Sequence, residues 1–433
     1  MAFGDLFRSR DEILRRMVEE ENKKNRDLAD PVSGAHLCES LDKLYSRILI
    51  SGGNQTERLY FFADRIRLAL RSRRSVVAIF CPQEPADGFF VPFEETGLCV
   101  DHAFPPVCFT DGTVCGFDPL LMDDPEDLPS ILTKISACIS GENHARSDFW
   151  TFVLDLLKAA HGTPTLKNFL ELDLHHLQQS IMRMSEDGSL SPMDAADLIQ
   201  RYDPSLSAQA AFAGDLKTAL TPLRKCLREN NVGLDALNRK QGILFLDCLS
   251  AGDRAPIDLL LQLTRRAATQ SKRLVLALDS VGCSDQEKLR AQFLTDTDAS
   301  LPLLLGGDLP ALLGSLFDKI SGSNSLKLVF RHDTGTSAEK WAKALGEYSQ
   351  QIIESSSGEG RSTAALLDRN NNRNLTIRVD HHAHRIPENA IGQLAPGRAV
   401  IRLPEIHTIQ RAEFLTMTLT QMKEKLCCFV KSC

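Results

Sequence analysis

The chain has 433 residues, of which 43% are hydrophobic and 25% are charged, so it is long enough for two or three domains with substantial cores. Its net charge of -7 argues against nucleic-acid binding through bulk electrostatics, and a local basic patch stays open. No stretch resembles a signal peptide or a membrane span. The 12 cysteines include no Cys-x-x-Cys pair, which favours buried thiols in a reducing cytoplasm.

Residues 1–45 are expected to form an N-terminal helical segment. Four apolar residues lie at helical spacing on one side of a charged stretch: Ile13, Leu14, Met17 and Val18. Such a helix either packs across a domain or binds a partner, and these alternatives are nearly even. The four residues are therefore a candidate partner-binding surface.

Residues 46–117 are expected to begin an α/β domain. A short apolar strand at 48–51 leads through a glycine-initiated turn into a long helix, and a second apolar strand follows at 75–82. This order predicts one right-handed βαβ unit. Residues 83–117 are rich in proline, aromatic and turn residues and predict a small hairpin.

Residues 118–235 predict an inserted all-helical domain, because helical patterns dominate them and break only at glycine-containing turns. Phe149 and Trp150 are expected to be buried at the root of this domain, since large aromatic residues contribute strongly to such junctions.

The α/β domain is expected to resume at residues 236–410. Apolar strands are predicted there at 242–247, 273–279 and 326–330, alternating with helices. The apolar stretch 301–317 contains Asp308, prolines and glycines, and is expected to be a soluble helical segment. Residues 411–433 are expected to form a C-terminal helix and a cysteine-rich tail. The predicted fold is a doubly wound, mostly parallel sheet, with its ligand site at the carboxyl edge of the strands.

Several segments, in this order, resemble the coupling ATPases of conjugation and type IV secretion, which are relatives of the hexameric DNA translocases. They are FDPL with SDFWTFVLDLLKAAH, then ILFLDCLSAG with the helix and strand after it, LKLVFRHDTGTSAEKWAKALGEYSQQ, and RIPENAIGQLAPGRAVIRL. The resemblance covers about residues 46–410. It implies a P-loop-type sheet with an inserted all-helical domain that contacts relaxosome proteins or secretion substrates.

The family's phosphate loop, G-x-x-x-x-G-K-[ST], falls on residues 52–59, and here the chain departs from the pattern. Gly52 is retained, whereas Glu57, Arg58 and Leu59 replace the second glycine, the lysine and the hydroxyl residue. That loop must wrap phosphates with N–H groups, neutralise them and hold Mg²⁺. A carboxylate opposes the polyanion, leucine cannot ligate a metal, and arginine is not equivalent to a slender lysine.

Two further positions depart from the family. The apolar run 242–246 leads into Asp247, which the resemblance assigns to the metal-holding aspartate of P-loop nucleotidases, and Cys248 stands where a catalytic glutamate usually follows. The resemblance makes 273–279 the sensor strand, which ends in Asp279 where the family usually has glutamine. The degenerate positions are thus Glu57, Arg58, Leu59, Asp247, Cys248 and Asp279.

Two functions follow from the resemblance. The first is a catalytically inactive pseudo-ATPase subunit of a secretion or conjugation machine, with no catalytic residues, cofactor or metal. The second is an active hexameric ATPase that translocates DNA or protein with an atypical loop. Only this alternative needs ATP and Mg²⁺, bound through Gly52, Arg58 and Asp247.

The expected partners are other machine subunits, including an active coupling ATPase, and a secretion substrate or adaptor protein. DNA is allowed but not supported by the net charge. The expected location is cytoplasmic, and attachment to the inner membrane through partners stays open.

Overall fold

The computed structural model describes residues 10–26, 43–82, 106–141, 144–284, 287–296, 301–357, 373–404 and 414–416. The chain divides into two compact units, which are treated separately. Asp42–Leu326 form the core of one, here called the sheet unit; Met1–Leu41 and Lys327–Thr416 form the other, here called the hairpin unit. Within the described residues, no helix is long and apolar enough to cross a membrane.

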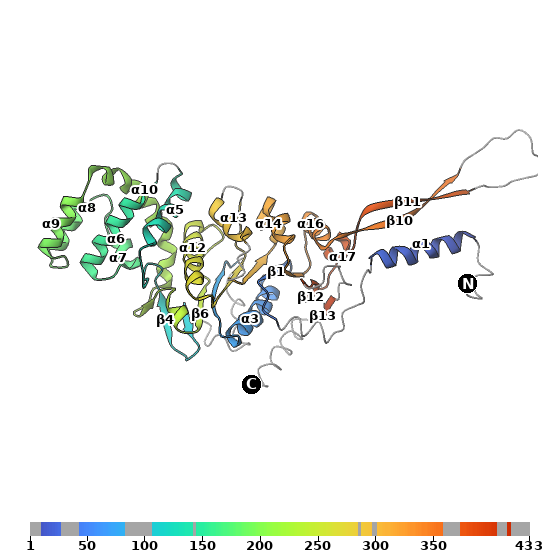
Figure 1. Ribbon diagram of the computed structural model, residues 1–433, viewed down its shortest axis with the longest axis horizontal. Coiled ribbons are helices and arrows are strands. Elements are labelled where there is room, and N and C mark those ends of the chain that lie inside the picture. Colours follow the sequence, from blue (N-terminus) through green and yellow to red (C-terminus); the bar gives the residue numbers. More distant parts are fainter. Residues whose placement is uncertain are drawn as a thin grey trace, which may run out of the picture. The chain divides into compact units, whose positions relative to one another are not determined.

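The sheet unit is built on a mostly parallel sheet (Figure 1). Its strand order is β1-β8-β7-β2-β6-β3-β4-β5, and the five strands from β1 to β6 run parallel. Their bounds are β1 Arg47–Ser51, β2 Ser75–Phe80, β3 Val107–Phe109, β4 Val114–Phe117, β5 Asn231–Val232, β6 Gly242–Leu246, β7 Leu274–Asp279 and β8 Leu303–Gly307. Every residue of these five parallel strands is buried, as apolar strands covered on both faces require. The structure confirms the predicted α/β class.

Helices alternate with these strands along the chain. They are α3 Gln55–Arg71, α11 Ala236–Arg239, α12 Arg254–Ser271, α13 Lys288–Thr295, α14 Leu309–Leu313 and α15 Phe317–Ser321, with a 3-10 turn, η3, at Gly314–Leu316. The predicted strand–turn–helix–strand unit is present as β1, α3 and β2.

The prediction of a helical segment over 301–317 is wrong at its start. Residues 303–307 form β8, which lies between β1 and β7 and pairs with both in parallel. The short helices α14 and α15 begin only after this strand. The sheet therefore contains a central strand that the sequence interpretation omitted.

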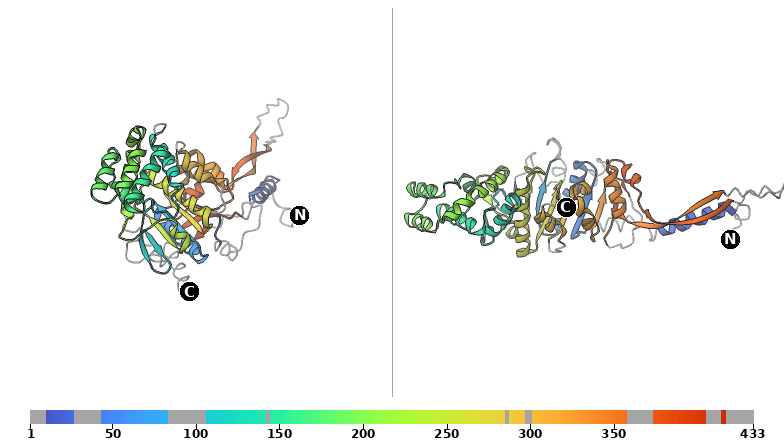
Figure 2. Two further views of the ribbon diagram at one scale, coloured as in Figure 1. Left: turned by 60° about the vertical axis from the view of Figure 1, so that its left-hand side comes forward. Right: turned by 90° about the horizontal axis from the view of Figure 1, so that it is seen from above.

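A run of helices separates β4 from β5: α5 Leu128–Ser140, α6 Ser147–His161, α7 Leu166–Glu171, α8 Leu177–Glu186, α9 Pro192–Arg201 and α10 Pro204–Leu220, followed by the 3-10 helix η2 Thr221–Cys226. Figures 1 and 2 show them gathered in one group, in which α5 and α10 contact α12. These helices belong to the same compact unit as the sheet, so a separate inserted domain stays a prediction. Phe149 and Trp150 of α6 are fully buried, as expected, with their rings edge to face.

Asp118 lies at the junction between the sheet and these helices. It follows the last residue of β4, and its buried carboxylate accepts hydrogen bonds from the backbone N–H of Leu166 at 2.9 and 3.0 Å and of Leu120 at 2.9 Å. Burial raises the pKa of this carboxyl to about 6, although the backbone hydrogen bonds act in the opposite direction. One side chain thus fixes the start of α7 to the end of a strand.

The raised pKa of Asp118 makes stability depend on pH. Because the pKa in the folded state exceeds the ordinary value of 3.8, the carboxyl contributes stability below about pH 4 that is lost as the pH rises through about 6. We expect the wild type to lose about 1–3 kcal/mol relative to an Asp118→Asn variant over this range. Urea unfolding at several pH values measures the difference. A difference independent of pH would contradict the assigned role.

The hairpin unit contains the remaining elements: α1 Arg10–Arg26, β9 Leu326–Val329, α16 Gly335–Leu345, β10 Glu347–Ser357, β11 Arg373–His384, α17 Glu388–Gly392, β12 Arg398–Arg402 and β13 Phe414–Thr416. β10 and β11 form an antiparallel hairpin, and β12 pairs antiparallel with β9 and β13. The predicted C-terminal helix is wrong at 414–416, which form a strand. The rest of 411–433, including the cysteine-rich tail, lies outside the described residues.

Candidate functional site

The segment between β1 and α3 begins with two glycines and ends in a helix cap. Gly52 and Gly53 both have positive φ, at 79° and 64°, a conformation that glycine adopts without strain. Asn54 then caps α3. Its side-chain Oδ1 accepts from the Glu57 N–H at 2.7 Å, while the Glu57 carboxylate accepts from the Asn54 N–H at 3.0 Å. This reciprocal capping box uses backbone donors at the helix N-terminus.

Glu57 also changes the electrostatics of the turn. Its buried carboxylate lies in the first turn of α3, where the helix dipole favours negative charge. A phosphate bound at a helix N-terminus uses the same dipole and the same kind of donors. The chain's own anion therefore takes one of the backbone donors, and the favourable position in the dipole, that a bound phosphate would use.

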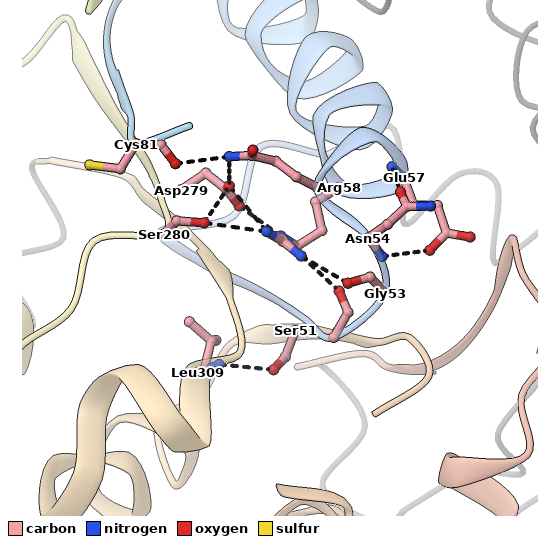
Figure 3. A network of polar contacts seen from close by, with 11 residues as sticks. Ser51, Gly53, Asn54, Glu57, Arg58, Cys81, Asp279, Ser280 and Leu309 are labelled. Atoms are coloured by element: carbon pink, nitrogen blue, oxygen red, sulfur yellow. Dashed lines mark hydrogen bonds and ion pairs between the residues drawn. The ribbon is translucent and has the colours of Figure 1, made fainter. Parts of the chain in front are cut away.

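Arg58 points inward from α3, and its side chain is only 2% exposed. Its Nε donates to Asp279 Oδ1 at 2.8 Å, and one terminal nitrogen donates to the carbonyl oxygens of Gly52 and Gly53 at 3.2 and 3.1 Å. The other terminal nitrogen contacts Asp279 Oδ2 and Ser280 Oγ, both at 3.3 Å. Figure 3 shows the guanidinium between the loop and the end of β7. The cation at the lysine position thus binds this chain's own groups.

Asp279 completes this arrangement from the carboxyl end of β7. It is fully buried, and besides Arg58 it accepts from Gln55 Nε2 and from Ser280 Oγ, each at 2.9 Å. Gly306 on β8 leaves room for it, since a Cβ at that residue would lie 2.6 Å from Asp279 Oδ1. A buried ion pair with this many hydrogen bonds is well compensated for its loss of hydration.

The residues present do not fit a magnesium nucleotide. Leu59, at the position of the metal-binding hydroxyl, is buried in the core and carries no oxygen. Arg58 is held by Asp279, and the turn's donors are partly used by Asn54 and Glu57. The described residues also contain no group of three or more His, Cys, Asp or Glu that could hold a metal ion.

Asp247, which the sequence analysis assigned to the metal-holding aspartate, does not lie beside the loop after β1. In the sheet, β8, β7 and β2 lie between β1 and β6, so the end of β6 is remote from the loop that follows β1. The carboxylate that reaches the loop is Asp279. Burial raises the pKa of Asp247, and the thiol of Cys248 contacts Cys226 instead of the loop.

Only some of the candidate partner-binding residues of α1 are exposed to solvent, where a partner could contact them. Val18 is buried, Ile13 and Leu14 are half-buried, and Met17 is 61% exposed. Helix α1 packs along β10 of its own unit. There Asn22 pairs with the backbone of Gln351, donating to its carbonyl at 2.7 Å and accepting from its N–H at 2.6 Å. This contact covers one edge of the hairpin.

Comparison with known proteins yields structural similarity alone. No family model matches the chain, and no curated protein is significantly similar to it. The chain is similar in structure to the bacterial conjugative coupling protein TrwBdeltaN70 in an unbound form, with 12% identity, a TM-score of 0.49, and 88% of this chain and 87% of that chain covered. A second match is the plasmid coupling protein TrwB in complex with ADP and Mg²⁺, with 12% identity, a TM-score of 0.46 and 88% of each chain covered. Likeness at this level assigns neither family nor activity.

Proposed function

We propose that the chain is a catalytically inactive, coupling-protein-like subunit of a type IV secretion or conjugation machine. It acts by binding partner proteins or by recruiting substrate, and it needs neither ATP nor Mg²⁺. Several sequence segments resemble coupling ATPases and occur in the same order, which supports a place for this chain in such a machine. The geometry after β1 supports the loss of catalysis.

The observation that carries the proposal is the Arg58–Asp279 ion pair. A P-loop lysine has to point at the nucleotide phosphates, and the metal-holding aspartate has to face Mg²⁺. In this chain the equivalent cation and the facing carboxylate neutralise each other at 2.8 Å with almost no solvent exposure. Bringing a nucleotide in would require breaking this buried pair, which is costly.

Exposed apolar side chains support a binding role for the helices between β4 and β5. Met182 of α8 is 49% exposed, while Met193 and Ile199 of α9 are 85% and 40% exposed. The two helices contact each other. Methionine adapts to varied partner surfaces, so α8 and α9 are the proposed recruitment surface. Met17 of α1 provides a second, smaller contact point.

The proposed partners are other subunits of the machine, including an active coupling ATPase, and a secretion substrate or adaptor. The proposed location is the cytoplasm, with any contact to the inner membrane made through those partners. Purified alone, the chain is expected to be a monomer or a small oligomer, because no nucleotide bridges neighbouring subunits.

Steady-state ATP hydrolysis by the full chain, with Mg²⁺, tests the loss of catalysis. We expect no turnover above that of an Asp279→Ala variant, because the loop offers neither a free cation nor a metal ligand. Asp247→Ala is the matched control at the other strand end and is expected to behave like the wild type. Turnover that disappears in Asp279→Ala would establish the active ATPase instead.

Partner capture tests the binding role with the same full chain as bait. Wild-type bait is expected to retain a coupling ATPase from the native cell, and a Met182→Ser, Met193→Ser double variant is expected to lose it. Val114→Ser, at a 57% exposed apolar residue of β4, serves as the control substitution outside the proposed contact surfaces. Equal retention by all three baits would reject α8 and α9 as the recruitment surface.

A further inference from the structure

Two cysteines of the sheet unit place their sulfur atoms side by side. Cys226 is the last residue of η2, and Cys248 follows β6 at the carboxyl edge of the sheet. Their Sγ atoms are 3.4 Å apart and share a hydrogen bond, although 22 positions separate the residues in sequence. A disulfide needs an S–S distance of about 2.05 Å, so only a small approach of the two side chains would join them.

The two thiols differ in access. Cys226 is buried, whereas Cys248 is half-buried and reaches solvent. A small reagent in solution therefore reaches the thiol of Cys248 before it reaches that of Cys226. The pair therefore has the arrangement of an attacking thiol and a resolving thiol.

The hydrogen bond between the two thiols acts in the same direction as the difference in exposure. The hydrogen bond with Cys226 lowers the pKa of Cys248, and Lys225 lowers it further, while burial and Asp247 oppose them. The same hydrogen bond, together with burial and Asp247, raises the pKa of Cys226, which Arg228 opposes. The thiolate, which is the nucleophile in disulfide exchange, thus forms preferentially on the more accessible sulfur.

Two other thiols of the sheet unit, Cys81 and Cys138, lack this combination. Cys81, at the end of β2, is buried, and its burial is the main cause that raises its pKa to about 12. Cys138 of α5 is exposed, yet desolvation raises its pKa, and no thiol of the described residues is hydrogen-bonded to it. The exposed Cys138 and the buried Cys81 therefore serve as comparison thiols for the Cys226–Cys248 pair.

We propose that Cys226 and Cys248 form a reversible dithiol–disulfide site that reacts with low-molecular-weight disulfides. The Cys248 thiolate attacks one sulfur of the small disulfide, breaks its S–S bond and releases one small thiol. Cys226, after losing its proton to solvent, attacks the Cys248 sulfur of the mixed disulfide and releases the second small thiol. The protein is oxidised by two electrons, and the small disulfide is reduced to two thiols.

The new bond would put a covalent link where the two elements now share a thiol–thiol hydrogen bond. It would link the end of η2, the last helical segment before β5, to the carboxyl edge of β6. Closing this loop restricts the unfolded chain and raises stability. Oxidation would therefore fasten the end of the helical run to the sheet. The site is independent of the proposed function, because it involves neither the loop after β1 nor α8 and α9.

The test uses the full chain incubated with glutathione disulfide, followed by alkylation of the remaining thiols and peptide mass mapping. We expect a Cys226–Cys248 linkage that dithiothreitol reverses, with Cys81 and Cys138 still reduced. The oxidised protein is expected to melt about 3–6 °C higher than the reduced protein. In the reduced protein, iodoacetamide is expected to modify Cys248 about tenfold faster than Cys138.

Single substitutions separate the two roles. Cys226→Ser is expected to trap a stable glutathione adduct on Cys248, because no resolving thiol remains. Cys248→Ser is expected to prevent both adduct and linkage, and Cys138→Ser is expected to change neither. The proposal is overturned if the wild type forms no Cys226–Cys248 bond, or if oxidation pairs the cysteines without selectivity.

Discussion

Replacing Asp279 with alanine is expected to lower the free energy of unfolding by about 3–5 kcal/mol. The substitution leaves the Arg58 guanidinium buried and without its carboxylate partner, and it removes the acceptor of Gln55 Nε2. Urea unfolding of the wild type and the variant measures the loss. Asp247→Ala removes a carboxylate that pairs with no cation of the loop, so it is expected to cost less.

A double-mutant cycle separates the ion pair from packing. Arg58→Met combined with Asp279→Leu removes both charges and keeps apolar volume, so it is expected to cost well below the sum of the single substitutions. The coupling is expected to be large because the two side chains contact each other directly with almost no exposure. Additive single effects would show that the two groups do not depend on each other.

Trp150→Ala is expected to lower the free energy of unfolding by about 3–5 kcal/mol. The indole is fully buried beside Phe149 and Phe169, and its Nε1–H donates to the Ala145 carbonyl at 3.1 Å. The alanine variant creates a cavity and leaves that carbonyl without its donor. Urea unfolding measures the loss, and Trp150→Phe is the milder control.

Fluorescence provides an independent check of the burial of Trp150. In a Trp341→Phe background, Trp150 is the single tryptophan, since the chain contains two. A buried indole emits at shorter wavelength and resists aqueous quenchers. Red-shifted, readily quenched emission from the folded variant would contradict its place in the core.

Local patterns in the sequence predicted a large part of the fold. The apolar strand, the two glycines and the following amphipathic stretch determine β1, its turn and α3 by short-range effects. The helical periodicity of 118–235 likewise predicted the helices between β4 and β5. Phe149 and Trp150 were expected in the core because burying large aromatic surface is strongly favourable.

These local patterns could not predict the order of the strands in the sheet. Two apolar runs end in aspartate, at Asp247 and Asp279, and nothing in either run tells which one lies near the loop. Pairing between β7 and β8, and between β8 and β1, decides it. β8 itself is rich in leucine, which favours helices, and it was hidden within a longer apolar stretch.

The Arg58–Asp279 pair was missed for the same reason. The two residues are 221 positions apart, and their contact follows only once β7 is known to lie close to β1. A partial signal was present, since an arginine at a lysine position and an aspartate at a strand end are complementary charges. The other change, Glu57, was interpreted only as unfavourable to phosphate, and its capping role with Asn54 was not recognised.

Isothermal titration of the full chain with ATP in the presence of Mg²⁺ tests the central claim most directly. Because Arg58 is held by Asp279 and Leu59 offers no metal ligand, we predict no saturable binding tighter than a Kd of about 1 mM. Saturable, magnesium-dependent binding in the micromolar range that persists in Asp247→Ala and is lost in Asp279→Ala would contradict the account.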